Sequence, residues 1–154
     1  MFLSNSKTLT GHTSYVWSVF AIDNIILSGS DDNTVKIWDR TSHTCTATLT
    51  GHTSAVISVF AIDNIILSGS WDNTIKIWDR TTFKCIKTIN EVKVLSVFAT
   101  KSMILAAKLN GSIKTFDYIT NKQAFTALMC MWKLGYPNEI IHEIFKWLGI
   151  NTYA

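Results

Sequence analysis

The dominant feature of the sequence is a nearly identical internal duplication. Residues 9–41 and 49–81 align without gaps at a spacing of 40, and they differ at only four of 33 positions. Agreement on this scale records duplication of one structural unit, because unrelated segments do not match by chance. A third and more divergent copy follows, in which Ser-Val-Phe-Ala at 96–99 repeats 58–61 at a spacing of 38. The chain is therefore expected to contain about three copies of one small unit.

Within each unit the residue pattern predicts short strands joined by tight turns. β-branched and aromatic residues dominate the predicted strands, whereas Gly, Asn and Asp mark the joints between them. The first unit is expected to form four strands, at about residues 15–21, 25–30, 34–39 and 45–50. In the third copy Asn110-Gly111 stands at the hairpin turn, and this dipeptide is a strong two-residue turn signal. A four-stranded unit of about 40 residues that repeats is typical of a β-propeller blade.

The repeats resemble those of a known family. The Gly-His and Trp-Asp dipeptides of WD repeats have counterparts in both units, at Gly11-His12, Trp38-Asp39, Gly51-His52 and Trp78-Asp79. The resemblance covers residues 9 to about 128 and implies an all-β fold of about three WD-type four-stranded propeller blades in an incomplete array. The blades are expected at about 9–50, 51–90 and 91–128, followed by an amphipathic helical tail at 129–154. The implied function is that of a scaffold or adaptor that binds other proteins.

The resemblance also implies a hydrogen-bonded set of side chains inside each blade. The set is His12, Ser28, Asp32 and Trp38 in the first unit, and His52, Ser68, Asp72 and Trp78 in the second. A His can bridge a buried carboxylate to a hydroxyl, and the Trp indole N–H then finds an acceptor while its ring fills the core. Asp, His and Ser together could also suggest a hydrolytic enzyme with a catalytic triad. Duplication of the set and its Trp partner favour a structural network.

The third unit lacks this set of residues. Ala106, Asn110 and Phe116 occupy the Ser, Asp and Trp positions, and the Gly-His dipeptide is gone. Because the members are lost together, no charged member of the set is left without its partner. We expect this unit to be the loosest of the three.

Positions at which the units differ are candidates for partner binding. Three of the four differences between the twin units change the character of the side chain: Tyr15/Ala55, Trp17/Ile57 and Asp31/Trp71. The resemblance places such positions on one rim of the fold, where the third unit has Lys93, Leu95 and Leu109. Aromatic and charged residues on one rim are typical of interface hot spots. The candidate partner-binding residues are Tyr15, Trp17, Asp31, Ile57, Trp71, Lys93 and Leu109, and neutral drift at exposed positions is the alternative.

The number of units leaves the array open. Propellers typically close about 4–8 blades into a ring, and an open array leaves faces and edges uncovered. Three interpretations stand side by side: several chains complete a ring, another protein covers the array, or the chain is a truncated product. Two chains of three blades would supply about six blades, which lies within the usual range.

A different pattern begins after about residue 128. Tyr136-Pro137-Asn138-Glu139 opens a predicted helix that ends at Leu148, with Gly149 after it. Residues 136–148 resemble the first helix of an F-box, which implies binding to the adaptor of a cullin-type ubiquitin ligase. The chain would then be a substrate receptor. The residues that carry this resemblance are Pro137, Ile140, Ile144, Phe145 and Leu148. An amphipathic helix that packs on the last blade is the alternative.

Composition and residue spacing argue against several other classes of protein. The net charge of +3 comes from scattered basic residues, whereas nucleic-acid binding usually shows a concentrated basic patch. The first residues lack the pattern of a signal peptide, and no apolar run approaches the roughly 20 residues that cross a bilayer. We therefore expect an intracellular protein of the cytoplasm or nucleus.

Histidine and cysteine spacing predicts neither a metal site nor a disulfide framework. The four histidines lie far apart in sequence, and phosphate-binding and nucleophile-elbow motifs are missing, so we expect no metal, cofactor or catalytic activity. Three widely spaced cysteines do not suggest disulfides. Cys45 and Cys85 fall at the same repeat position and are expected to be small buried residues on strands.

Overall fold

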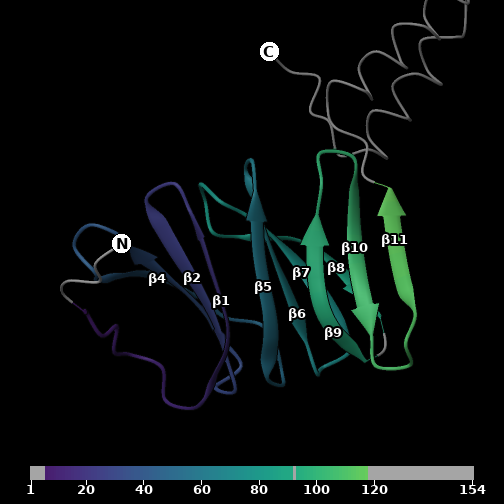
Figure 1. Ribbon diagram of the computed structural model, residues 1–154, viewed down its shortest axis with the longest axis horizontal. Helices are drawn as coiled ribbons and strands as arrows, with labels where there is room; N and C mark the ends of the chain where they lie inside the picture. The colour runs from purple at the N-terminus through teal and green to yellow at the C-terminus, as the bar shows by residue number, and fades with distance from the viewer. Residues whose placement is uncertain (1–5, 92, 118–154) are drawn as a thin grey trace, which may run out of the picture. The chain divides into compact units, whose positions relative to one another are not determined.

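The computed structural model describes residues 6–91 and 93–117, and the regular structure in these ranges is entirely β-strand. Three sheets follow one another along the chain (Figure 1). The first contains β1 (Val16–Ile22), β2 (Ile25–Ser30), β3 (Val35–Asp39) and β4 (Cys45–Leu49). The second contains β5 (Val56–Ile62), β6 (Ile65–Ser70), β7 (Thr74–Asp79) and β8 (Cys85–Asn90). The third contains β9 (Val94–Ala99), β10 (Met103–Lys108) and β11 (Ile113–Asp117).

The strand pattern of the first unit agrees with the sequence prediction. Each strand of the first sheet begins and ends within one residue of its predicted range. An all-β fold built of small sheets is therefore confirmed for the described residues. The expected fourth strand of the third blade, the array boundary at 128 and the helix within 129–154 lie outside those residues. Among the described residues, no helix has the length and apolar character needed to cross a membrane.

Tight turns join the strands at short polar residues. Asp23 lies between β1 and β2 with φ of 50°, and Asn33 lies between β2 and β3 with φ of 67°. Asp and Asn tolerate this left-handed conformation because their side chains bond to nearby backbone groups. The second sheet repeats both turns, at Asp63 and Asn73. The duplicated sequence therefore produces a duplicated backbone.

Glycines let the neighbouring sheets approach closely. A Cβ atom on Gly29 would lie 2.8 Å from Cγ1 of Val56, and one on Gly69 would lie 2.9 Å from Cγ1 of Val94. A real Cβ does not come this close, so each position requires glycine for the observed packing. The valines reach from the first strand of one sheet onto the second strand of the preceding sheet. They form part of a core that is buried between sheets.

Polar and aromatic contacts complete the same junctions. The backbone N–H of Val59 donates to the Ser18 hydroxyl over 3.1 Å, and that of Val97 donates to the Ser58 hydroxyl over 3.0 Å. A ladder of three phenylalanines crosses both junctions, with ring centroids 4.6 and 4.4 Å apart, at Phe20, Phe60 and Phe98. One pattern of contacts therefore joins the first sheet to the second and the second to the third.

The prediction that Cys45 and Cys85 are buried is wrong. Both are free thiols on exposed residues. They begin β4 and β8, the last strands in the order of their sheets. A strand at the end of a sheet has a neighbour on one side only, and most residues of β4 and β8 are exposed. The repeat position of these residues was identified correctly, but their burial was not.

Candidate functional site

The first of the predicted side-chain sets assembles around the imidazole of His12. Its Nδ1 lies 2.7 Å from an oxygen of Asp32, and its Nε2 lies 2.7 Å from the hydroxyl of Ser28. The indole N–H of Trp38 donates to that hydroxyl oxygen over 2.8 Å. The backbone N–H of Thr13 donates to the Asp32 carboxylate over 3.0 Å. The set connects the segment before β1 with β2, the turn after β2, and β3.

The second sheet contains the same arrangement. His52 lies 2.7 Å from both Asp72 and Ser68, and the Trp78 indole donates to Ser68 over 2.8 Å. The hydroxyl of Thr74 donates to Asp72 over 2.7 Å. The structure therefore assembles the four residues of each predicted set within its own sheet.

Burial and hydrogen bonding act in opposite directions on the charged members. Burial alone would raise the pKa of Asp72, but hydrogen bonds from Thr74 and His52 outweigh it and hold the pKa below its ordinary value. Burial lowers the pKa of His52, and the neighbouring Asp72 offsets this only in part. At neutral pH the pair is therefore an ionised carboxylate beside a neutral imidazole. In that state Nδ1–H donates to Asp72, and Nε2 accepts the Ser68 hydroxyl proton.

The order Asp, His, Ser is also that of a hydrolase triad. A nucleophilic hydroxyl must be reachable by substrate, whereas Ser28 and Ser68 are both buried. Each hydroxyl oxygen also accepts an indole N–H. A pocket of about 330 Å³ lies beside the first set, between His12, Ser28 and the exposed Val19. In the second sheet, the first sheet covers the face that corresponds to this pocket, and the second set keeps the same distances there. We therefore interpret both sets as braces within their sheets.

The third sheet has a different polar contact, which the sequence analysis missed. Glu91 is buried, and its carboxylate accepts a hydrogen bond from Lys108 over 2.5 Å. Lys114 Nζ lies 2.6 Å from its other oxygen. The hydrogen bond from Lys108, aided by Lys114, holds the pKa of Glu91 below its ordinary value. The available signal was that Glu91, an acidic residue, falls next to the lost His position.

Two tryptophans from neighbouring sheets meet on the rim. Trp17 on β1 and Trp71 after β6 have ring centroids 5.7 Å apart, and each is 51% exposed. The indole N–H of Trp17 points to the carboxylate of Asp31 over 3.4 Å. Trp17, Asp31 and Trp71 come from two of the three repeat positions at which the twin units change character, and the structure places them together.

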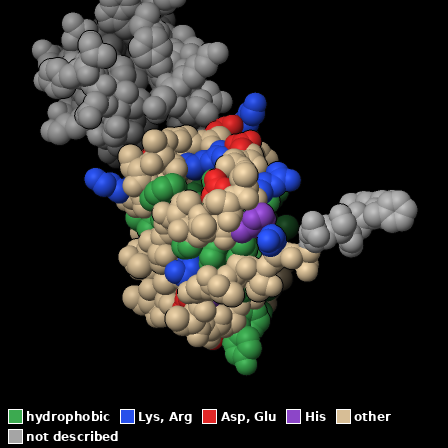
Figure 2. Space-filling view, turned by 90° about the vertical axis from the view of Figure 1, so that its left-hand side faces the viewer, with side chains coloured by type: hydrophobic (Ala, Val, Ile, Leu, Met, Phe, Trp, Pro, Cys, Tyr) green, Lys and Arg blue, Asp and Glu red, His purple; other side chains and the backbone are tan. Residues whose placement is uncertain are grey.

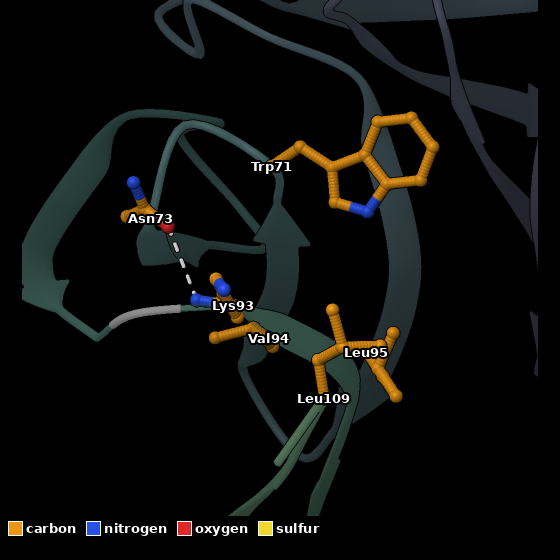
Figure 3. Close-up of a pocket in the computed structure, with 6 residues that line it drawn as sticks. All are labelled: Trp71, Asn73, Lys93, Val94, Leu95 and Leu109. Atoms are coloured by element: carbon orange, nitrogen blue, oxygen red, sulfur yellow. Dashed lines mark hydrogen bonds between the residues drawn. The ribbon is translucent and has the colours of Figure 1, made fainter.

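An apolar pocket continues this surface onto the third sheet. It measures about 330 Å³, and Figure 3 shows Trp71 on one side and Leu95 and Leu109 on the other. The remaining lining residues are Asn73, Lys93 and Val94. The Asn73 side chain accepts a hydrogen bond from the backbone N–H of Lys93 over 3.1 Å and fixes the start of β9. We call the surface formed by Trp17, Trp71, Lys93, Leu95 and Leu109 the tryptophan rim.

Two further candidates, Tyr15 and Ile57, belong neither to the pocket lining nor to the contact of Trp17 with Trp71 and Asp31. Tyr15 is exposed, and its backbone carbonyl accepts a hydrogen bond from the N–H of Asp31 over 2.8 Å. Ile57 is half-buried. Asn73 is identical to Asn33 in the twin units, so the differences between the units do not point to it. The adaptor-binding candidates lie outside the described residues: Pro137, Ile140, Ile144, Phe145 and Leu148.

A family model described as WD domain, G-beta repeat, matches residues 3–39 and 43–79. The chain belongs to the WD-repeat family. WD repeats generally mediate protein–protein interactions and typically form scaffolds without catalytic activity. The second matched WD repeat includes β4 of the first sheet together with β5, β6 and β7 of the second. The boundary between the two matched repeats therefore falls inside the first sheet, which joins them.

The WD match leaves the third sheet uncovered, since the matched residues end at 79. The comparison with curated proteins gives no match. In residues 6–91 and 93–117, no cluster of three His, Cys, Asp or Glu side chains is arranged to hold a metal ion.

Proposed function

We propose that this chain is a protein-binding scaffold whose partner docks on the tryptophan rim. The observation that carries the proposal is the contact between Trp17 and Trp71, two half-exposed rings supplied by different sheets. Large aromatic side chains dominate the energetics of protein interfaces. An exposed aromatic pair beside an apolar pocket is a typical docking surface for a partner's side chain.

The lining of the pocket suggests the chemistry of the partner. Leu95, Leu109 and the Trp71 ring offer an apolar wall, which favours an aliphatic or aromatic side chain. Lys93 is exposed beside it, and its ammonium group favours a neighbouring carboxylate. The partner is therefore expected to present an apolar residue next to an acidic one.

A peptide library displayed on phage and selected on the immobilised full chain tests this proposal. Selected peptides should share an apolar residue beside Asp or Glu. Replacing Trp71 by Ala should weaken their binding at least tenfold, because the substitution removes one wall of the pocket and the contact with Trp17. Ile86→Ala is the matched control, because Ile86 is also exposed but lies on β8, away from the pocket.

Two results would contradict the rim as the docking site. Either no peptide is enriched over an unrelated immobilised protein, or Trp71→Ala and Ile86→Ala bind the enriched peptides equally well. The alternative of a ubiquitin-ligase receptor stays a prediction from residues 136–148, and deleting them should leave rim binding unchanged.

A further inference from the structure

The two junctions between sheets follow one rule. The later sheet supplies two valines and a backbone N–H, the earlier sheet supplies a glycine and a serine hydroxyl, and each sheet supplies one phenylalanine ring. The two surfaces differ, so a junction has a front half and a back half. The outer faces of the first and third sheets can each be compared with one of these halves.

The first sheet exposes a complete front half. Val16 and Val19 correspond to Val56 and Val59, but Val19 is 69% exposed whereas Val59 is 5% exposed. No described residue covers these valines, and the pocket beside Val16 and Val19 opens on this face. Figure 2 views the molecule from this end and shows hydrophobic side chains between polar ones at the surface.

The third sheet exposes the matching back half. At the spacing of 38, Ser96 and Phe98 correspond to Ser58 and Phe60 of the second sheet. Both Ser96 and Phe98 are exposed. Phe98 ends the ladder of rings that begins at Phe20. One chain therefore carries a front half and, apart from the glycine, a back half of a junction on opposite ends of its described sheets.

We propose that two copies of this chain associate head to tail through these faces. In each new junction the N–H of Val19 donates to the hydroxyl of Ser96 in the other copy, and Phe20 packs on Phe98. The contact is heterologous, so one copy uses both of its faces when the assembly closes. Two copies, each with the three sheets formed by its described residues, give six sheets, which lies within the range of about 4–8 that propellers close.

Ala107 weakens the new junction relative to the two internal ones. It occupies the position of Gly69, where a Cβ atom would lie 2.9 Å from a valine Cγ1. The new contact must therefore open by a few tenths of an ångström or shift a valine. Replacing Ala107 by Gly removes the clash and should lower the Kd of association about tenfold or more. If Ala107 only supported the fold of its own sheet, the substitution would not lower this Kd.

Charged residues at the proposed junction between copies offer a second and independent variant. Asp23 of the first sheet pairs with Arg80 of the second over 2.7 Å. The corresponding residues in the new junction are Lys101 and Arg40, which carry like charges. Lys101→Asp should recreate the opposite-charge pair and tighten association by a few-fold at low salt, with the gain lost at high salt.

Sedimentation velocity of the full chain over a range of concentrations tests the proposal. The wild type should pass reversibly from 17.3 kDa to twice that mass, and Ala107→Gly should lower the Kd. Val19→Asp should abolish the association, since it places a charge on the valine face. Ile86→Asp is the control on the middle sheet and should leave the Kd unchanged; circular dichroism confirms that each variant folds.

Several outcomes would overturn the inference. A wild type and an Ala107→Gly variant that both stay monomeric at every concentration show that the faces do not pair. A mass that grows without limit shows an open filament instead of a closed pair. A dimer whose Kd is unchanged by Val19→Asp and by Ala107→Gly uses another surface.

Discussion

The four-residue sets show why a blade keeps all four members or loses all of them. The Ser68 hydroxyl serves two buried groups, because it donates to His52 and accepts from the Trp78 indole. Removing it would leave a ring nitrogen and an indole N–H without partners, and unmade hydrogen bonds of buried groups are costly. The third sheet avoids this cost by losing the set as a whole, and it gains the ion pairs of Glu91 instead.

The pKa of His52 makes the stability of the protein sensitive to mild acid. Because this pKa lies below its ordinary value of 6.5 in the folded state, the unfolded state binds the proton more readily. The contribution of His52 to the stability of the folded state is therefore fully present above pH 6.5, and it is lost as pH falls towards the pKa of His52 in the folded state. The lowered pKa of Asp72 has the same sign and extends the loss below its ordinary value of 3.8.

Urea unfolding of the wild type and of His52→Gln measures this effect. The wild type should lose free energy of unfolding between pH 7 and pH 5. The variant should start less stable and lose less over the same range, because glutamine does not titrate. Parallel losses in the two proteins would contradict the role given to His52.

At the scale of elements, the closeness of neighbouring sheets depends on single glycines. Gly69→Ala places a Cβ 2.9 Å from Val94 and 3.0 Å from Val97, both side-chain contacts. We expect a loss of about 1–3 kcal/mol in the free energy of unfolding, as is usual for overpacking. Thermal or denaturant unfolding of the variant measures it.

A second substitution separates the clash from the intrinsic cost of alanine. Adding Val94→Ala to Gly69→Ala removes the closest atom, so the double variant should lose less than the sum of the single losses. Strict additivity of the two losses would show that the Cβ of residue 69 does not meet Val94.

At the scale of the whole molecule, self-association through the end faces links stability to concentration. A partner that binds only the folded chain stabilises it by mass action. The Tm of the wild type should therefore rise as protein concentration is raised around the Kd, and the rise should be larger for Ala107→Gly. Differential scanning calorimetry at several concentrations measures this. Val19→Asp should show one Tm throughout, and a concentration-dependent Tm in that variant would count against the assigned face.

The resemblance to WD repeats indicated the residues of the two bracing sets, and the sequence by itself determined the repeated unit with its strands and turns. These follow from local spacing and residue type, which a strand or tight turn expresses directly. Burial and contacts between sheets were decided only by tertiary structure. Val16 and Val56 hold the same place in nearly identical units, yet Val16 is 49% exposed and Val56 is fully buried. The difference arises because a sheet covers only one of them. The exposed cysteines, the pairing of Glu91 and the pocket beside Trp71 likewise depend on which segments the fold brings together.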